Sequence, residues 1–464
     1  MPSIKKKYKL LLINPLNKRK QGMNLDLDGI YPPMAFGIIA ALTPPHWDIE
    51  LIDENFTPFE YKEADLVAFT SLTATINRCY ELATEYKKNK IPTVIGGIHA
   101  SMLPKEASQY MDSVVVGEAE SVWETLINDF EKNRLKKFYT AKLTPLHSSP
   151  PPRIDLYNPS YAFGTIQTTR GCPMSCEFCS VHAFNGSKYR LRPVEEAVRD
   201  FLAIQKERVY IVDDNFVGYS KTARDHALEF LKKITELGAQ KDWVGSASMN
   251  IAEDEELLKY AALSGCKMIF LGIESELIDQ LEQSNKKVNI KIGVDKYAEV
   301  YRKIHKHKMA IIGAFIFGLE NDTPETLHNR TSYILDSDLD IFQSTILTPL
   351  PGTDLYKRFE EEGRLLYTDF PNDWERYNYT EVVYKPQKMS ADEFEKAAVE
   401  NWDRLYDVKT LKKKFLSTLK LSQNPTTAAW AITTNLHLRN FALEGRRKAV
   451  YMDDVFPEIM SGIK

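Results

Sequence analysis

The chain has 464 residues, 43% of them apolar and 27% charged, which is an ordinary globular composition and enough for two or three domains of about 150 residues. A net charge of -4 at pH 7 argues against nucleic-acid binding, and five cysteines are too few for a secreted disulfide framework. No stretch of about 18 apolar residues predicts a transmembrane helix, and the first apolar run is too short for a signal peptide, so we expect a cytoplasmic protein.

Residues 1–142 alternate short apolar runs with helical patterns. The runs are rich in β-branched residues, as buried parallel strands are, and predict strands at residues 10–13, 49–52, 66–70, 93–95 and 114–116. Helices are predicted at residues 35–42, 76–88 and 121–132. This alternation predicts an α/β, doubly wound (flavodoxin/Rossmann-like) domain, whose ligands bind beyond the carboxyl ends of the strands. Small or polar residues stand at those ends: Asn14, Ser71, Thr73, Gly96, Gly97, Gly117 and Glu118.

These strand ends resemble the cobalamin-binding domain that precedes the catalytic core in one large subfamily of radical S-adenosylmethionine (SAM) proteins. The resembling segments are residues 13–15, 31–33, 71–73, 96–100 and 116–118. The resemblance implies that the seven strand-end residues form a cobalamin site. The chain lacks Asp-x-His-x-x-Gly, the motif that supplies a histidine ligand to cobalt in other cobalamin proteins. The alternative is therefore a flavodoxin-like domain that only packs on the core or binds substrate.

A linker at residues 143–160 contains three consecutive prolines, which is typical of a semi-rigid connector. The alternation then restarts over residues 161–355. Strands are predicted at residues 164–168, 209–212, 244–247, 268–271, 310–317 and 341–347, and helices at residues 194–205, 223–237, 254–264, 294–307 and 324–335. This pattern predicts a partial parallel (β/α)6 barrel that stays open, with all loops after the strands on one face.

The first predicted strand of this barrel is followed by three cysteines in a C-x3-C-x2-C spacing: Cys172, Cys176 and Cys179. Thiolates suit iron–sulfur clusters, and a cubane cluster ordinarily takes four of them. Cys79 and Cys266 are far away in sequence, so one iron of a [4Fe-4S] cluster would be open to a ligand other than protein. The alternatives are a zinc site that includes the nearby His182 and a purely structural role.

The cysteine spacing, with the aromatic Phe178 just before the third cysteine, resembles the cluster loop of the radical SAM superfamily. The resemblance implies a [4Fe-4S] cluster on the three cysteines, with SAM as chelator of the open iron. It also implies that the SAM-binding residues are Phe178, Ser248, Glu274 and Asp213. For Asp213, capping of the next segment is the alternative. A closer similarity is to the subgroup that contains the hopanoid methylases, through residues 213–216, 272–275 and 349–356.

Residues 356–464 leave the barrel pattern and predict an α-rich C-terminal domain. An aromatic segment at residues 369–384 either lines a substrate pocket or forms a small core under the barrel, and we favour the core. Helices are predicted at residues 391–406 and 428–448. The basic amphipathic residues 409–420 form either a membrane-surface face or a solvated helix packed by its apolar side, and we favour the second.

The resemblance implies a radical SAM enzyme that uses its [4Fe-4S] cluster to cleave SAM reductively. The favoured function is cobalamin-dependent C-methylation of an unactivated carbon in a lipid or another metabolite. The alternatives are an oxidoreductase or cyclase that makes 5′-deoxyadenosine without methyl transfer, and a cluster- or zinc-bearing binding protein. We expect a small-molecule or lipid substrate, an electron donor such as flavodoxin or ferredoxin, no nucleic-acid partner, and at most a peripheral membrane contact.

Overall fold

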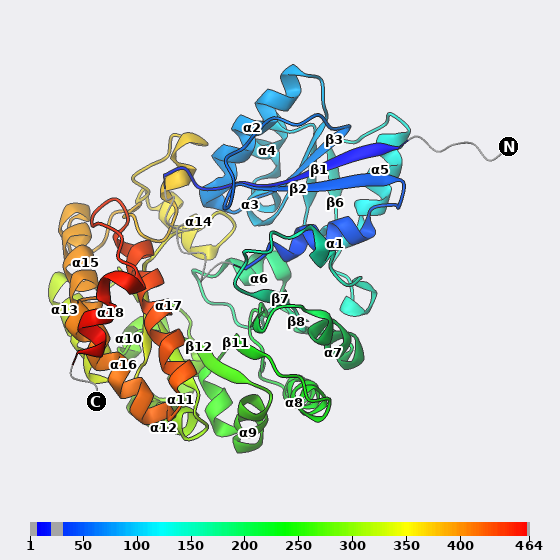
Figure 1. The fold of residues 1–464 in the computed structure, drawn as a ribbon. Helices are drawn as coiled ribbons and strands as arrows, with labels where there is room; N and C mark the ends of the chain where they lie inside the picture. Colours follow the sequence, from blue (N-terminus) through cyan, green and yellow to red (C-terminus); the bar gives the residue numbers. More distant parts are fainter. Residues whose placement is uncertain (1–6, 20–30, 462–464) are drawn as a thin grey trace.

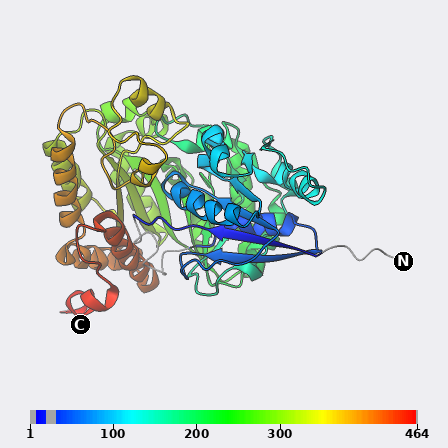
Figure 2. The same cartoon turned by 90° about the horizontal axis from the view of Figure 1, so that it is seen from above.

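A computed structural model describes residues 7–19 and 31–461. Figure 1 shows an N-terminal α/β unit, an open barrel below it, and a layer of C-terminal helices beside the barrel. In the view from above, these helices lie on the side of the molecule away from the N-terminus (Figure 2). The predicted α/β class, with two parallel sheets and a helical C-terminal part, is confirmed.

The N-terminal unit is built on a six-stranded parallel sheet with the strand order β2-β1-β3-β4-β5-β6. Its strands are β1 (Tyr8–Asn14), β2 (Trp47–Asp53), β3 (Leu66–Thr70), β4 (Thr93–Gly96), β5 (Ser113–Val116) and β6 (Phe138–Thr140). The flanking helices are α1 (Met34–Leu42), α2 (Ile76–Lys88), α3 (Ile98–Met102), α4 (Pro104–Tyr110) and α5 (Trp123–Glu131). The sequence did not predict β6, α3 or α4, because such short elements carry little periodic signal.

Alternate residues of β1 enter two cores on opposite faces of this sheet. Leu10 and Leu12 pack with α1 and α5, whereas Leu11 and Ile13 pack with α2 and α4. All four side chains are fully buried. A parallel strand that is covered on both faces needs such a continuous apolar run, which is why the sequence located it.

The barrel sheet also has six parallel strands, in the order β14-β13-β12-β11-β10-β7. Its strands are β7 (Gly164–Ile166), β10 (Arg208–Ile211), β11 (Asp242–Ala247), β12 (Cys266–Glu274), β13 (Ala310–Phe317) and β14 (Ile341–Ile346). The helices of this part are α6 (Ser180–Asn185), α7 (Val194–Ala203), α8 (Lys221–Glu236), α9 (Glu255–Leu263), α10 (Ile278–Gln283), α11 (Lys287–Ile292), α12 (Tyr297–Lys306) and α13 (Pro324–Asp336). Since β7 and β14 form the two edges, the barrel is open, as predicted.

The C-terminal helices lie beside the barrel, and the two that carry Trp402 and Asn435 cover its edge at β14. The C-terminal helices are α14 (Asp354–Glu361), α15 (Ala391–Leu405), α16 (Val408–Ser422), α17 (Pro425–Leu443) and α18 (Met452–Met460). The Asn435 side chain accepts a hydrogen bond from the Phe342 amide at 3.3 Å, and the Tyr406 hydroxyl donates to the Phe342 carbonyl at 2.6 Å. Trp402 donates to the Ser344 carbonyl at 3.2 Å. Side chains thus satisfy backbone groups that an edge strand leaves unpaired.

The aromatic segment at residues 369–384 bridges the two sheets, which corrects the prediction of a small core under the barrel. Trp374 and Tyr377 belong to the core of the N-terminal unit, and the Trp374 indole donates to Glu106 of α4 at 2.9 Å. Tyr384 belongs to the barrel core instead. The hydrophobic spacing of the segment could not reveal this, because both partners lie far away in sequence.

One of the lysines of the basic helix α16 is buried inside the protein. Lys414 is buried and donates to the carbonyls of Ser337 at 2.7 Å and Ile334 at 3.3 Å, at the end of α13. Burial lowers the pKa of Lys414 to about 8. The favoured interpretation, a helix packed by one side, agrees with these contacts. Within the described ranges, no helix has the length and apolar character needed to cross a membrane.

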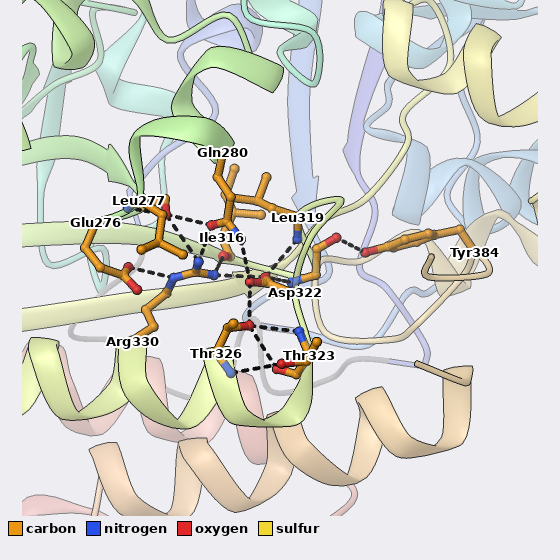
Figure 3. A network of polar contacts seen from close by, with 12 residues as sticks. Glu276, Leu277, Gln280, Ile316, Leu319, Asp322, Thr323, Thr326, Arg330 and Tyr384 are labelled. Atoms are coloured by element: carbon orange, nitrogen blue, oxygen red, sulfur yellow. Dashed lines mark hydrogen bonds and ion pairs between the residues drawn. The ribbon is translucent and has the colours of Figure 1, made fainter. Parts of the chain in front are cut away.

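A buried arginine holds together the loops that follow β12 and β13 (Figure 3). The Arg330 guanidinium donates to Asp322 and Glu276, each at 2.9 Å, and to the Ile316 carbonyl at 2.8 Å. It also donates to the side chains of Ser275, at 3.2 Å, and Gln280. Asp322 in turn accepts the backbone amides of Gly318 and Leu319. All N–H donors of the guanidinium are used, so the two loops are fixed relative to each other.

Replacement of Arg330 by Met should lower the free energy of unfolding by about 3–5 kcal/mol, because it leaves the buried Asp322 carboxylate without its counter-charge. The measurement is urea unfolding of the cofactor-free protein, followed by circular dichroism. The control is Thr323→Ala, which removes only the N-cap of the same helix and should cost about 1 kcal/mol. Equal destabilisation by the two variants would contradict the role given to Arg330.

Candidate active site

The cysteine loop lies at the carboxyl edge of the barrel and is held from two sides. The Asn285 side chain, after α10, donates to the Ser175 carbonyl at 2.8 Å and to the Ser175 hydroxyl at 2.9 Å. The Glu177 carboxylate accepts two hydrogen bonds from Arg358 of α14, at 2.6 and 3.0 Å. These contacts fix the loop between the barrel and the C-terminal part. All three of its cysteines are half-buried free thiols.

Asp213, at the end of β10, supports the strand that leads into the cysteine loop. Its buried carboxylate accepts from the Thr168 amide at 2.6 Å, the Thr168 hydroxyl at 2.5 Å and the Thr169 hydroxyl at 2.9 Å. Burial raises the pKa of Asp213 to about 6, although these hydrogen bonds act to lower it. The structure therefore places Asp213 below the loop, with both carboxylate oxygens already bonded to protein.

Asp214 and Gly171 shape the base of the loop. The Asp214 carboxylate accepts the Gly171 amide at 2.8 Å and the Asn185 side chain at 2.9 Å. Gly171 has a φ of +91°, and a Cβ there would lie 2.4 Å from the Lys188 carbonyl oxygen. Only glycine fits this position without a shift of the backbone.

Glu274 lies at the end of β12 beside a lysine that the sequence did not single out. Glu274 is buried, has a φ of +66°, and forms an ion pair with Lys286 at 2.5 Å. Burial lowers the pKa of Lys286, but the charges of Glu274 and Cys176 more than offset this and raise it. Burial also raises the pKa of the Cys176 thiol to about 11, while the Lys286 charge acts in the opposite direction. A positive charge thus lies where thiolates need stabilisation.

Ser248 lies after β11 with two polar neighbours. Its hydroxyl accepts from the Asn215 side chain at 3.2 Å and is hydrogen-bonded to the Tyr219 hydroxyl. The Asn215 carboxamide oxygen is buried and has no hydrogen-bond partner among the described residues. An acceptor is therefore available to a ligand next to Ser248. Phe178 is half-buried and packs against the barrel core.

A cavity of about 760 Å³ lies between the N-terminal sheet, the inner face of the barrel and α17. On the N-terminal side it is lined by residues at the carboxyl ends of β1 and β3, including Asn14, Ser71 and Thr75. These strands are neighbours at the topological switch point, where doubly wound sheets bind ligands. The facing walls are Phe163, Tyr210, Val244, Met268, Phe270, Ile312 and Gln343 of the barrel, and Trp430, Thr433, Thr434, His437, Leu438 and Phe441 of α17.

The cavity and the cysteine loop are connected through the same strands. Val244 of β11 and Phe270 of β12 line the cavity, and the carboxyl ends of these strands carry Ser248 and Glu274. At about 3.3 Å per residue, Phe270 lies about 13 Å from Glu274 along β12. A ligand of the cavity can therefore reach toward a second ligand that binds beside the cysteine loop.

The predicted cobalamin residues separate into two groups. Asn14 and Ser71 line the cavity. Thr73 is buried and shares a hydrogen bond with His99 at 3.3 Å, outside the cavity lining. Gly97 has a φ of +97°, and a Cβ there would lie 2.6 Å from the Ser71 carbonyl oxygen, so it allows two loops to approach closely. Gly96 and Gly117 likewise lie outside the lining.

Glu118 forms a buried ion cluster with two arginines that flank the cysteine loop. It lies 3.1 Å from the Arg170 guanidinium and accepts from Arg190 at 2.8 Å. The two arginines lie opposite each other on the antiparallel strands β8 (Thr169–Arg170) and β9 (Arg190–Leu191). The half-buried Glu120 pairs with Arg170 at 2.9 Å. Glu118 thus ties the end of β5 to the cysteine loop.

Comparison with known proteins agrees with this arrangement in both units. A model of the radical SAM superfamily matches residues 166–331, and a model of the B12 binding domain matches residues 22–127. The first match includes the cysteine loop and most of the barrel. The second begins after β1 and covers β3 with the residues that follow it, of which Thr70 and Ser71 line the N-terminal side of the cavity.

Several curated proteins are similar over most of the chain. Bacteriochlorophyllide d C-8(2)-methyltransferase of Chlorobaculum tepidum is 30% identical over 465 residues, which covers 93% of this chain and 96% of the relative. The C-12(1)-methyltransferase of the same organism is 30% identical over 404 residues, which covers 84% of this chain and 85% of the relative. Hopanoid C-2 methylase of Rhodopseudomonas palustris is 29% identical over 360 residues, which covers 74% of this chain and 67% of the relative.

A solved structure shows the same fold at low sequence identity. The radical SAM methyltransferase TsrM from Kitasatospora setae, with cobalamin and a [4Fe-4S] cluster bound, superposes with a TM-score of 0.65 at 15% identity. The superposition covers 92% of this chain and 99% of TsrM.

The fold and the cysteine loop define a radical SAM enzyme with an N-terminal B12-binding domain. More narrowly, the chain belongs to the family of cobalamin-dependent radical SAM methyltransferases, as the resemblance implied. Its cofactors are a [4Fe-4S] cluster, SAM and cobalamin. A small-molecule or lipid substrate and a source of electrons belong to this class of enzyme.

Sequence reasoning missed the charged partners of the site. Lys286 stands in a polar run that looks like an exposed loop, and Arg358 stands in a helix beyond the predicted barrel. Arg170 directly precedes the cysteine motif, yet nothing local connects it with Glu118. Each partner is recognised only when distant segments are brought together.

Replacement of Glu118 by Gln should loosen the N-terminal unit from the barrel. The change leaves Arg170 and Arg190 without their shared counter-charge, which should cost about 3–5 kcal/mol. Limited proteolysis in residues 143–160, between the two sheets, should then become faster. The control Glu120→Gln removes an outer, half-buried partner and should change stability by less than about 1 kcal/mol. An unchanged proteolysis rate in the Glu118 variant would argue against the ion cluster as the connection.

Proposed function

We propose that the enzyme transfers a methyl group, by way of cobalamin, to an unactivated carbon of a large and mainly apolar metabolite. The cavity carries this proposal, because it is bounded by the B12-binding unit on one side and by the barrel strands that lead to the cysteine loop on the other. The apolar walls exclude water, which protects a reaction that proceeds through radicals.

Cys172, Cys176 and Cys179 are proposed as the cluster ligands. They share one loop, their thiols are free, and neither Cys79 nor Cys266 is near it in sequence. The cluster and SAM, when bound, supply the radical, and cobalamin supplies the methyl group. Lys286 favours the charged form of the thiols, and the contacts of Glu177 and Ser175 fix the loop. A zinc site with His182 does not agree with membership of the radical SAM family.

Glu274, Ser248 and Phe178 are proposed to contact SAM. The buried carboxylate of Glu274 and the hydroxyl of Ser248 lie at adjacent strand ends beside the cysteine loop, and the Asn215 oxygen adds an acceptor. Asp213 acts indirectly, since its carboxylate oxygens already hold Thr168 and Thr169. Arg330 supports the loop that carries Glu274 through Ser275 and Glu276.

Asn14 and Ser71 are proposed to face cobalamin at the switch point of the N-terminal sheet. The other predicted residues shape the neighbouring loops: Thr73, Gly96, Gly97, Gly117 and Glu118. Within the domain boundaries proposed above, residues 1–142 bind cobalamin, 143–160 connect, 161–355 hold the cluster and SAM, and 356–464 close the cavity.

Two substrate classes are suggested by the relatives. Two of them are named for methylation of bacteriochlorophyllide d and one for methylation of a hopanoid. Both classes are bulky fused-ring compounds, in agreement with the apolar cavity walls. An enzyme that makes 5′-deoxyadenosine without methyl transfer remains the alternative to test.

We also propose a flavodoxin or ferredoxin as the electron donor. Pro173 and Ser175 of the cysteine loop are exposed, so a donor can approach the loop from outside. Contact with a membrane surface stays a prediction, and its support is the three exposed lysines of α16, Lys409, Lys413 and Lys420.

Replacement of any one of the three loop cysteines by Ala should remove most of the iron and reduce 5′-deoxyadenosine formation to background. The measurements are iron content after anaerobic reconstitution and product analysis after addition of SAM and a reductant. Cys266→Ala is the matched control, because this buried thiol belongs to the barrel core and donates to the Met268 carbonyl at 3.4 Å. Deoxyadenosine formation that survives in a loop variant would refute the assignment of that cysteine.

Reconstitution with iron, sulfide and cobalamin, followed by SAM, a reductant and a candidate substrate, should yield both 5′-deoxyadenosine and S-adenosylhomocysteine. Formation of S-adenosylhomocysteine should depend on cobalamin, because the methyl group passes through it. Protein without cobalamin is the control. Deoxyadenosine alone, with any substrate of either class, would favour the non-methylating alternative and leave the N-terminal unit without a catalytic part.

A further inference from the structure

The cavity between the two sheets is lined almost entirely by neutral groups. Its described lining contains apolar and aromatic side chains, together with asparagines, threonines, Ser71, Gln343 and His437. It contains no carboxylate and no lysine, and Arg208 is the one permanently charged side chain in the lining that the structure describes. A ligand that filled this cavity would therefore meet a single fixed positive charge.

Arg208 is the first residue of β10 and lies at an exposed edge of the cavity. Its guanidinium lies 5.6 Å from the centre of the Trp430 ring, on α17. Among residues 7–19 and 31–461, no carboxylate forms an ion pair with it, whereas Arg170, Arg190, Arg192 and Arg330 all have acidic partners. The Trp430 face holds the guanidinium in place by a cation–π contact and leaves its donors open.

We propose that Arg208 binds a carboxylate at the periphery of the substrate, and that the substrate is a tetrapyrrole acid. This inference rests on the proposed function and decides between its two substrate classes. A planar guanidinium binds carboxylates through two parallel hydrogen bonds. A chlorophyllide-type ring carries a propionate at its edge, whereas a hopanoid hydrocarbon carries no anionic group for Arg208 to bind.

The walls agree with a flat ring system that carries one acid. Phe163 and Trp430 pack edge to face with their ring centres 5.6 Å apart, and both line the cavity next to Arg208. Thr433 and Thr434 add hydroxyl groups on the same side of α17. Apolar contacts hold such a ring without fixing its orientation, because the hydrophobic effect is non-directional. One charge at the rim selects which edge of the ring points outward and hence which carbon points inward.

The phosphate of cobalamin is a second source of negative charge near this cavity. An experiment on Arg208 must therefore separate a substrate carboxylate from the cofactor. The suitable probe is pyropheophorbide a, a chlorin with one propionate, together with its methyl ester, which has the same ring and no charge. Binding is followed by chlorin fluorescence on the anaerobically reconstituted holoenzyme, and cobalamin content is measured on the same samples.

The wild-type enzyme should bind the acid about ten-fold more tightly than the ester, as expected for one charge-assisted contact at a partly exposed rim. Arg208→Gln should bind both compounds equally, with about the affinity of the wild type for the ester, and should retain its cobalamin. Lys206→Gln is the matched control: it removes a nearby positive charge outside the cavity lining, and should keep the preference for the acid.

Three results would overturn the proposal. Equal binding of acid and ester by the wild type would remove the role of the charge, and binding of neither compound would remove the tetrapyrrole class. Loss of cobalamin from Arg208→Gln with an unchanged preference for the acid would assign the arginine to the cofactor. Because binding requires no turnover, formation of 5′-deoxyadenosine together with cobalamin-dependent formation of S-adenosylhomocysteine tests the proposed function separately.

Discussion

The ion cluster of Glu118, Arg170 and Arg190 determines how the two halves of the active site face each other. Removal of such charges from water costs several kcal/mol per ion, so the cluster persists only because each charge finds an opposite one at close range. Apolar surfaces between the sheets add stability, but they are not directional. Charge-assisted hydrogen bonds require a defined geometry. The cluster therefore sets the distance between the end of β5 and the cysteine loop more sharply than apolar packing can.

An open barrel creates a second requirement, which the C-terminal helices meet. A closed eight-stranded barrel fills its interior with side chains, whereas six strands leave two edges and an accessible inner face. Helix α17 covers this face: Asn435 bonds to the edge strand β14, while Thr433 and His437 line the cavity. One side of α17 therefore contacts β14 and another faces the cavity, and its apolar residues are spread around the helix. One helix completes the sheet and also forms a wall of the cavity.

Local sequence signals located most of the long elements, but they missed short ones and did not reveal the contacts between elements. The strands at residues 66–70 and 310–317 were predicted with the bounds of β3 and β13, since buried parallel strands are continuous apolar runs. The cysteine spacing likewise identifies the loop without any tertiary information. Lys286, Arg358 and the contact of Trp374 with Glu106 could not be predicted, because their partners lie between 12 and 268 residues away. Glu118 was placed at the correct strand end, yet its partners come from the separate two-stranded sheet of β8 and β9.

The two faces of the cavity are stabilised by different kinds of contact. The cysteine loop and the B12-binding unit are held by dense networks of buried charge, since radical chemistry requires reacting groups in fixed positions. The wall formed by β10 and α17 is held by apolar packing and carries few polar groups. Changes in that wall alter the shape and charge of the site without disturbing the ion networks. The proposed substrate wall and the proposed cofactor contacts are therefore separate sets of residues, so the same cofactors can serve ring systems as different as a chlorin and a hopanoid.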